Sequence, residues 1–307
     1  MSFLVVGSVA YDGIETPFGS EDKILGGSAT YISITAGFFG LKPRLVGIVG
    51  RDFAVTDVQL LKSHNVDLEG LQVDNSGDTF FWRGKYHYDL NNRDTLETSL
   101  NVFEHFNPEI PDAYKDSEFV CLGNIAPALQ NRVLDQVTRP KLVVCDTMNF
   151  WIEGARADLL ETLKRVDVLI INDSEARELS SEPNLVRAAE KIQKMGPEIL
   201  IIKKGEHGAL LFTGSGIFSA PAYPLVDIFD PTGAGDTFMG GFVGWLARTG
   251  DLRDENMRRA VIFGSVMASF CVEAFGSKRL VSLENGDIEK RYAEFMEMST
   301  IPEIINL

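Results

Sequence analysis

The stretch of the sequence with the clearest chemical potential is Asp230-Pro-Thr-Gly-Ala-Gly-Asp236, which an apolar, glycine-containing run follows at once. Pro231 favours a turn, and Gly233 and Gly235 permit backbone conformations that other residues avoid. A glycine turn at the start of a helix directs free N–H groups outward and forms a site for an anion. A carboxylate at position 236 would repel that anion unless it does chemistry, for example as the base that takes a proton from an attacking hydroxyl. The alternative is that Asp236 only caps the helix.

Composition limits the kinds of partner. The 307-residue chain carries 29 basic and 44 acidic residues, a net charge of −15, which disfavours binding to nucleic acid and to anionic membranes. No apolar run approaches the roughly 20 residues of a membrane span, and the first residues do not resemble a signal peptide. Cys121, Cys145 and Cys271 lie in separate apolar runs, as is typical of buried free thiols. We therefore expect a cytoplasmic protein without nucleic-acid or membrane partners.

Apolar, β-branched runs predict strands that are buried on both faces of a sheet. These runs are residues 3–6, 45–49, 119–122, 142–145, 168–171, 199–202 and 209–212. Helical patterns lie between them at 27–39, 54–64, 127–138, 153–165 and 185–195, and further helices follow at 232–248, 253–273 and 286–298. This alternation predicts parallel βαβ units. The expected fold is α/β: a three-layer α/β/α sandwich with a mostly parallel central sheet, as a single domain over 1–307.

Residues 78–88 do not fit that pattern, because they alternate with period two. Phe80, Trp82, Tyr86 and Tyr88 share one face, and Arg83, Lys85 and His87 share the other. The extended piece from Asp12 to Thr16 could pair with this strand. We expect a small β-sheet lid built from about 12–18 and 78–106. Its aromatic face would cover a substrate, the domain edge or a partner subunit in a homodimer.

The run Asp230–Phe238 resembles the C-terminal signature of the ribokinase/PfkB family of carbohydrate kinases, and the similarity extends over nearly the whole chain. Further motifs follow the family's order: Gly26-Gly27, Gly47–Asp52, Asn172–Glu175, Lys203–Gly208 and Ala268–Gly276. The resemblance implies a ribokinase-like fold. It also implies an ATP- and Mg²⁺-dependent transfer of the γ-phosphate to a hydroxyl of a sugar or sugar-like small molecule.

The resemblance assigns the catalytic centre to the glycine loop. Asp236 would be the catalytic base, and the amides of Gly233, Ala234 and Gly235 would form the anion hole.

The resemblance assigns metal binding to other residues. Asn172 and Glu175 would hold Mg²⁺, largely through water; the alternative is a cap at a strand end beside a surface carboxylate. The resemblance also implies a potassium site, to which Asp230 and the carbonyls near Ala274 and Gly276 could supply oxygen ligands.

The resemblance also assigns residues to the two substrates. The resemblance places the nucleotide against Lys203, Gly205, Gly208 and Thr232, although the two glycines could equally form a plain hairpin turn. It places the acceptor against Asp12, Gly26 and Gly27, with Asp12 binding hydroxyls unless it serves only a turn or cap. Trp82 could stack on a sugar or base, and Arg93 could contact a phosphate, as could Arg83.

Two positions depart from the family pattern, and both concern the acceptor. Tyr31 stands where the family often has an asparagine, and Asp146-Thr-Met-Asn149-Phe-Trp151 replaces the family's D-x-N-x-R. The sequence therefore favours a sugar kinase without specifying the sugar. The alternatives are a nucleoside kinase of the same fold and a non-catalytic sugar- or nucleotide-binding protein. The sequence has no GxxxxGK[ST], no GxGxxG after its first strand and no metal-ligand spacing among its four histidines.

Overall fold

A computed structural model describes residues 1–284 and 286–301. In it the chain forms one nine-stranded sheet, one four-stranded sheet and the helices that pack on them. The order of the large sheet is β13-β12-β11-β10-β9-β8-β1-β4-β5. Its strands are β1 (Phe3–Val6), β4 (Arg44–Gly50), β5 (Asp67–Asp74), β8 (Phe119–Leu122), β9 (Leu142–Asp146), β10 (Val168–Asn172), β11 (Ile199–Lys203), β12 (Ala209–Thr213) and β13 (Gly216–Ala220). All neighbouring pairs from β5 to β11 are parallel, and β12 and β13 add an antiparallel edge. The predicted α/β sandwich with a mostly parallel sheet is confirmed.

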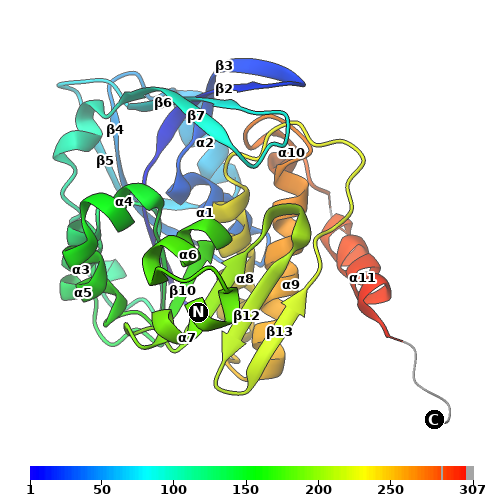
Figure 1. The fold of residues 1–307 in the computed structure, drawn as a ribbon. Helices are drawn as coiled ribbons and strands as arrows, with labels where there is room; N and C mark the ends of the chain where they lie inside the picture. The colour runs from blue at the N-terminus through cyan, green and yellow to red at the C-terminus, as the bar shows by residue number, and fades with distance from the viewer. Residues whose placement is uncertain (285, 302–307) are drawn as a thin grey trace, which may run out of the picture.

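Helices cover both faces of this sheet (Figure 1). One apolar cluster joins a sheet face to α1 (Ser28–Gly37), α2 (Val55–Ser63), α8 (Ala234–Thr249), α9 (Asp254–Cys271) and α11 (Asp287–Ser299). A second cluster joins the other face to α3 (Pro127–Gln136), α5 (Arg156–Leu163), α6 (Asp173–Ser180) and α7 (Leu185–Gln193). Alternate residues of β1 supply both clusters, with Phe3 and Val5 in the first and Leu4 and Val6 in the second. This division is the reason that the central strands read as unbroken apolar runs.

Several elements differ from the sequence prediction. The helix expected at 153–165 is two helices, α4 (Asn149–Gly154) and α5, because Ala155 breaks the helical conformation between them. The two edge strands of the large sheet, β5 and β13, were not predicted, and most residues of β5 are partly exposed. Short helix α10 (Lys278–Val281) and helix α6, which starts at the end of β10, were also missed. Edge strands and short helices carry weak periodicity, so their patterns do not stand out in the sequence.

The smaller sheet lies across one end of the sandwich (Figure 1). It has the order β3-β2-β6-β7, formed by β3 (Gly19–Gly26), β2 (Ala10–Thr16), β6 (Phe80–Tyr86) and β7 (Arg93–Ser99). Strands β2 and β6 pair in parallel, with Asp12 opposite Trp82. Strands β3 and β7, which were not predicted, extend the sheet on either side because a tight turn follows each of the central strands.

The predicted aromatic face of the small sheet is shorter than expected. Strand β6 ends at Tyr86, and the chain turns back through residues 87–92, where the backbone N–H of His87 donates to the carbonyl of Asn92. Tyr88 therefore lies in the turn and is 86% exposed, so it does not belong to the covered face.

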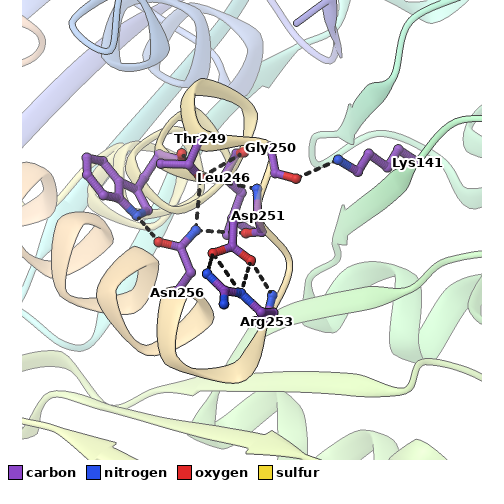
Figure 2. Close-up of polar contacts among 8 residues, drawn as sticks. Lys141, Leu246, Thr249, Gly250, Asp251, Arg253 and Asn256 are labelled. Carbon is purple, nitrogen blue, oxygen red and sulfur yellow. Dashed lines mark hydrogen bonds and ion pairs between the residues drawn. The ribbon is translucent and has the colours of Figure 1, made fainter.

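The far ends of α8 and α9 are joined by a compact polar network (Figure 2). Asn256 accepts a hydrogen bond from Trp245 Nε1 (2.8 Å) and donates to Thr249 Oγ1 (2.9 Å) and to the carbonyl of Asp251 (2.7 Å). Lys141 donates to the carbonyl of Gly250 and ties this turn to the start of β9. The network fixes the position of α8, whose first turn carries Asp236 at the opposite end.

Among residues 1–284 and 286–301, no helix is both long enough and apolar enough to cross a membrane.

Candidate active site

The glycine loop leads directly into helix α8. Gly233 precedes the helix with a φ of +76°, a left-handed conformation that favours glycine, and Ala234, Gly235 and Asp236 form the first turn. Asp230 is fully buried and fixes the loop through hydrogen bonds from two backbone amides. Its Oδ1 accepts from the Thr232 amide (2.8 Å), and its Oδ2 accepts from the Gly276 amide (2.9 Å). The Ala234 amide donates to the Pro231 carbonyl (3.2 Å), so one of the three amides predicted for the anion hole is already used within the turn.

Asp236 is partly buried at this helix end. Its Oδ1 is buried and has no hydrogen-bond partner among the described residues. Burial and, next, the nearby Asp146 carboxylate raise the pKa of Asp236 to about 7, although Lys203 and Arg93 act in the opposite direction. A carboxylate with a pKa near neutrality can accept a proton and later release it at physiological pH.

Two charged side chains approach this point from the carboxyl ends of parallel strands. Asp146 ends β9, and Lys203 ends β11, with β10 between them. A Cβ added to Gly235 would lie 2.7 Å from Lys203 Nζ, so the ammonium group sits directly against the first turn of α8. No carboxylate of the described residues lies within 4.0 Å of Lys203 Nζ. A cation held without a close partner at the positive end of a helix is suited to an incoming anion.

The charge of Lys203 is maintained by more distant carboxylates. Burial lowers its pKa, but the surrounding Asp146, Glu175 and Asp236 outweigh this effect, and the pKa is raised above its ordinary value. Burial raises the pKa of Asp146 as well, and Lys203 opposes the increase. Sequence reasoning noted Asp146 only as a departure from the family pattern. Its position directly after a buried strand was the signal that could have placed it in the site.

Asn172 and Glu175 form a reciprocal capping box at the start of α6. Asn172 Oδ1 accepts from the Glu175 amide (2.8 Å), and Glu175 Oε2 accepts from the Asn172 amide (2.7 Å). The cap that the sequence left open as an alternative is therefore present, but Glu175 is buried and not a surface carboxylate. Burial and then the Asp146 charge raise its pKa to about 7. Oε1 receives no hydrogen bond from the described part of the chain and is available to a ligand.

Asp12 lies on the small sheet, facing the glycine pair. It is 5% exposed, and a Cβ on Gly26 would lie 1.9 Å from Asp12 Oδ2, so only glycine fits at position 26. Gly27 has a φ of +91°, and a Cβ there would meet the Ser8 carbonyl oxygen at 2.5 Å. Burial and, to a smaller extent, the carboxylates of Asp230 and Asp236 raise the pKa of Asp12 to about 8. The structure thus brings the predicted acceptor residues and the predicted base into one region.

The small sheet also reaches the glycine loop directly. Tyr86 is buried, and its hydroxyl accepts a hydrogen bond from Thr232 Oγ1 (3.1 Å). Arg93 opposes Tyr86 in the register of the sheet, and its guanidinium lies 5.6 Å from the centre of the Trp82 ring. Two of the residues predicted to contact the acceptor, Trp82 and Arg93, therefore lie close together on the small sheet.

Arg83 does not join this pair. It is next to Glu15, with 3.6 Å between Arg83 Nη1 and Glu15 Oε1, and it bonds Asp22 at 3.1 Å. Because successive strand residues alternate between faces, Arg83 points away from the face that carries Trp82, and the expectation of a phosphate contact there is wrong.

The turn between β11 and β12 contains the predicted nucleotide glycines. Gly205 has a φ of +54° and Gly208 a φ of +81°, and the turn closes through the Gly208 amide and the Gly205 carbonyl (3.0 Å). A Cβ on Gly208 would meet the Ala220 carbonyl oxygen at 2.1 Å, which is a structural reason for this glycine. The small sheet touches this turn as well, since Asn91 Nδ2 donates to Glu206 Oε2 (3.0 Å).

A cavity of about 320 Å³ lies beside the glycine loop. It is lined by Leu225, Val226, Asp227, Phe229 and Glu273. The Phe229 amide donates to the Val272 carbonyl (2.9 Å). The cavity therefore lies between the segment 225–229, which precedes the glycine loop, and the end of α9. Sequence reasoning did not find these residues, because a loop without regular periodicity carries no signal of what it encloses.

A partly buried carboxylate in the first turn of a helix, with a second sheet placed across it, is compatible with an enzyme that transfers a phosphoryl group to a hydroxyl. The chain belongs to the pfkB family of carbohydrate kinases, which it matches over residues 5–282.

Known relatives agree with this assignment. A cytidine kinase of Thermococcus kodakarensis is 30% identical over 252 residues, which cover 81% of this chain and 89% of the relative. A nucleoside kinase of Methanothermobacter thermautotrophicus is 26% identical over 306 residues, 94% of each chain. The structure of Burkholderia thailandensis nucleoside kinase in complex with inosine matches the fold with a TM-score of 0.77 at 21% identity, over 95% of this chain and 97% of that one. The predicted family and ribokinase-like fold are confirmed.

Proposed function

We propose that this kinase transfers the γ-phosphate of ATP to a hydroxyl on the sugar of a nucleoside, with Asp236 as the base. The observation that carries the proposal is the Asp236 carboxylate in the first turn of α8, directly after the glycine loop, with a buried Oδ1 that has no partner among the described residues. A cap would use its oxygens on the helix amides, but Asp236 Oδ1 has no partner among the described residues. It is therefore available to a substrate hydroxyl.

In the proposed step the acceptor oxygen attacks the γ-phosphorus. The new O–P bond forms as the bond between the γ-phosphorus and the bridging oxygen breaks, and ADP leaves with that electron pair. The hydroxyl proton passes to Asp236, while the amides of Gly233 and Gly235 and the ammonium group of Lys203 face the charge that develops on the phosphoryl oxygens. The pKa of Asp236, raised by burial to about 7, suits a base that must be ionised before the step and protonated after it.

In the proposed arrangement the nucleotide base lies in the cavity next to the glycine loop. The cavity beside Phe229 and Glu273 is large enough for a purine ring, and it adjoins the glycine loop through Asp230.

The residues near Lys203 fit Mg²⁺ bound mainly through water and phosphate oxygens. The described residues contain no cluster of three or more protein ligands for a metal ion, and Mg²⁺ requires few protein carboxylates when a nucleotide supplies the rest. Glu175 Oε1 and the Asp146 carboxylate are the groups that would face the ion. When bound, Mg²⁺ would neutralise charge on the phosphate oxygens.

A nucleoside is favoured over a free sugar for two reasons. The cytidine kinase and the nucleoside kinase described above match most of this chain. In addition, the aromatic ring of Trp82 lies with Arg93 on the sheet that carries Asp12, and a ring of this kind can stack on a base. A free sugar is the second candidate, favoured by the buried Asp12, whose two oxygens suit a pair of neighbouring hydroxyls.

An acceptor screen with ATP and Mg²⁺ tests the proposal. Cytidine, uridine, adenosine, inosine, ribose, fructose and fructose phosphate would be compared by ADP release and by detection of the phosphorylated product. Phosphorylation of a nucleoside with a kcat/KM at least tenfold above any free sugar is expected. A preference for a free sugar would overturn the nucleoside assignment. Thermal shifts on ligand addition without any turnover would indicate a binding protein.

We also propose a monovalent-cation site next to the glycine loop. Each oxygen of Asp230 already accepts one amide hydrogen bond but keeps a second lone pair, and Gly276 brings a second turn of chain to the same point. Potassium should therefore raise the rate above that measured in tetramethylammonium at equal ionic strength. Equal rates would exclude the site.

A further inference from the structure

The β6–β7 hairpin reaches from the small sheet to the turn between β11 and β12. Its strands are joined by the turn 87–92, in which Asp89 Oδ1 accepts hydrogen bonds from the Asn91 amide (3.1 Å) and from the Asn92 amide (3.1 Å). Asn92 Nδ2 also donates to Asp89 Oδ2 (2.7 Å). These bonds close the turn on itself, so the tip of the hairpin follows the two strands that carry it.

Two side chains of the hairpin contact parts of the chain that are distant in sequence. Thr232 Oγ1, in the glycine loop, donates to the Tyr86 hydroxyl (3.1 Å), and these residues are 146 positions apart. Asn91 Nδ2 donates to Glu206 Oε2 (3.0 Å) across 115 positions. The hairpin is therefore tied at its base to the loop that precedes Asp236 and at its tip to the turn between β11 and β12.

The tip fits closely against Gly205. A Cβ on Gly205 would lie 2.8 Å from Asn91 Oδ1, so the Asn91 side chain occupies the space that a larger residue at position 205 would need. The Asn91 side-chain amide thus meets two successive residues of the turn, Gly205 with its oxygen and Glu206 with its nitrogen. A side chain at position 205 would have to displace Asn91 from this contact.

The same hairpin carries the aromatic ring predicted to lie against the acceptor. Trp82 Nε1 donates to Thr95 Oγ1 on β7 (3.4 Å), and a Cβ on Gly84 would lie 2.1 Å from Trp82 Cη2, so the ring lies over the hairpin itself. In the ladder between β2 and β6, Trp82 stands opposite Asp12. A displacement of the hairpin therefore moves Trp82 directly and reaches Asp12 through one strand pair.

We propose that Tyr86 and Asn91 are positioning residues that couple the two substrate sites, so that each substrate binds more tightly when the other is bound. This inference rests on the proposed function and on the predicted placement of the nucleotide against Gly205 and Thr232. A nucleotide held there orders the two segments to which the hairpin is tied, and acceptor binding then has less conformational freedom to remove. Such a coupling is reciprocal, so the acceptor tightens nucleotide binding by the same factor.

The two contacts have to be removed together. The bond between Asn91 and Glu206 is exposed, and the bond between Thr232 and Tyr86 joins two neutral hydroxyls, so each contributes modestly by itself. They lie at opposite ends of the turn, and loss of one leaves the hairpin tied at the other. The informative variant is therefore the double variant Tyr86→Phe/Asn91→Ala.

Hydrogen exchange with Mg²⁺ and AMP-PNP, a non-hydrolysable ATP analogue, tests the coupling without an acceptor. In the wild type, the analogue should slow amide exchange in the glycine loop and also, about fivefold or more, in β6 and β7. The double variant should keep the protection of the glycine loop and lose the added protection of β6 and β7.

The outcomes of this experiment separate the inference from the proposed function. Protection of the glycine loop without any effect on β6 and β7 in the wild type overturns the inference and leaves the proposed function standing. Equal protection of β6 and β7 in the wild type and the double variant also overturns it. Absence of protection in the glycine loop itself, at saturating AMP-PNP, overturns the nucleotide assignment and the inference with it.

Tyr88→Phe is the matched control. It removes the same atom from the same hairpin as Tyr86→Phe, but Tyr88 lies in the turn and is almost fully exposed. This variant should show the wild-type protection of β6 and β7. Loss of that protection in Tyr88→Phe would assign the effect to the general stability of the hairpin and would overturn the roles of Tyr86 and Asn91.

Steady-state kinetics provide a second measurement, with the acceptor that gives the highest kcat/KM in the screen described above. The acceptor KM of the wild type should fall about fivefold between an ATP concentration far below its KM and a saturating one. In the double variant the acceptor KM should be the same at both ATP concentrations. A purely structural role would lower the active fraction, and with it kcat, but would leave the fivefold ratio in place. A retained ratio in the double variant contradicts the coupling.

Discussion

The pKa of Asp236 is set by burial and by residues from three other parts of the chain, Asp146, Lys203 and Arg93. Replacing Asp236 by asparagine removes the proton acceptor and keeps the shape of the side chain. Asp236→Asn should lower kcat by about 100-fold or more, with ATP affinity retained, because a lost general base affects the chemical step. Asp116→Asn, an exposed carboxylate paired with Arg44 on the surface, serves as the control and should leave kcat unchanged. Near-normal turnover of Asp236→Asn would remove Asp236 from the mechanism.

Glu175 has two separable tasks at the residue scale. Its Oε2 closes the cap of α6, and its Oε1 is available to a metal-bound water. Glu175→Gln keeps an oxygen for the cap but removes the charge. We expect the capping contribution to stability to be retained and a several-fold higher Mg²⁺ concentration for half-maximal rate.

The matching control for this variant is Glu178→Gln, on the same helix but outside the capping box. An unaltered Mg²⁺ dependence in Glu175→Gln would leave Glu175 with the capping role alone.

At the scale of elements, the small sheet has two surfaces that could be used. One surface carries Asp12, Trp82 and Tyr86 toward the glycine loop, where Tyr86 meets Thr232. At the other side, β7 is an exposed edge strand with Leu96 51% exposed, and such an edge can pair with a second copy. The sheet can therefore act as a lid, as a dimer contact or as both.

Trp82→Ala separates these roles. If the sheet is a lid, the variant should raise the acceptor KM several-fold, with little change in ATP affinity, because Trp82 lies beside Arg93 on the sheet that carries Asp12. Acceptor-free ATP hydrolysis should also increase, since a looser lid admits water.

Tyr88→Ala is the control for this variant, because Tyr88 lies in the neighbouring turn and is almost fully exposed. Size-exclusion chromatography of Trp82→Ala completes the test. Loss of a dimer with an unchanged acceptor KM would show that the ring packs an interface and does not cover the acceptor.

For the whole molecule, the buried acids make stability depend on pH in an unusual direction. The pKa values of Asp12, Glu175 and Asp236 are raised to about 8, 7 and 7, chiefly by burial. A raised carboxyl pKa stabilises the folded state below the ordinary value near 4, and this stabilisation is lost as the pH rises through the folded-state pKa. The wild type should therefore lose thermal stability between about pH 4 and pH 8.

Asp12→Asn tests this relation because asparagine does not ionise. Its Tm should exceed that of the wild type at pH 8.5 by at least about 2 °C, and the difference should shrink at pH 4. The same variant should lose acceptor binding if Asp12 contacts substrate hydroxyls. A difference in Tm that is the same at both pH values would show that burial does not raise the pKa of Asp12 in the folded protein.

The sequence by itself determined the sandwich and the glycine loop. Runs such as Val168–Ile171 are apolar on both faces, so they specify buried parallel strands without reference to the rest of the chain. Gly233 and Asp236 lie three residues apart at a helix start, so their relation is set by one turn of backbone. Local rules of this kind extend over a few residues, and the corresponding predictions were confirmed.

Tertiary structure decided which side chains meet. Asp146 and Lys203 are 57 positions apart, and they face one point because β9, β10 and β11 are neighbours in the sheet and end at the same edge. Tyr31 lies under Gly233 because α1 packs against α8, and no periodicity in either segment carries that information. Strand order and helix packing depend on the sum of many apolar contacts across the whole core. The pattern around any single residue therefore cannot reveal the neighbours that shift the pKa of Asp236.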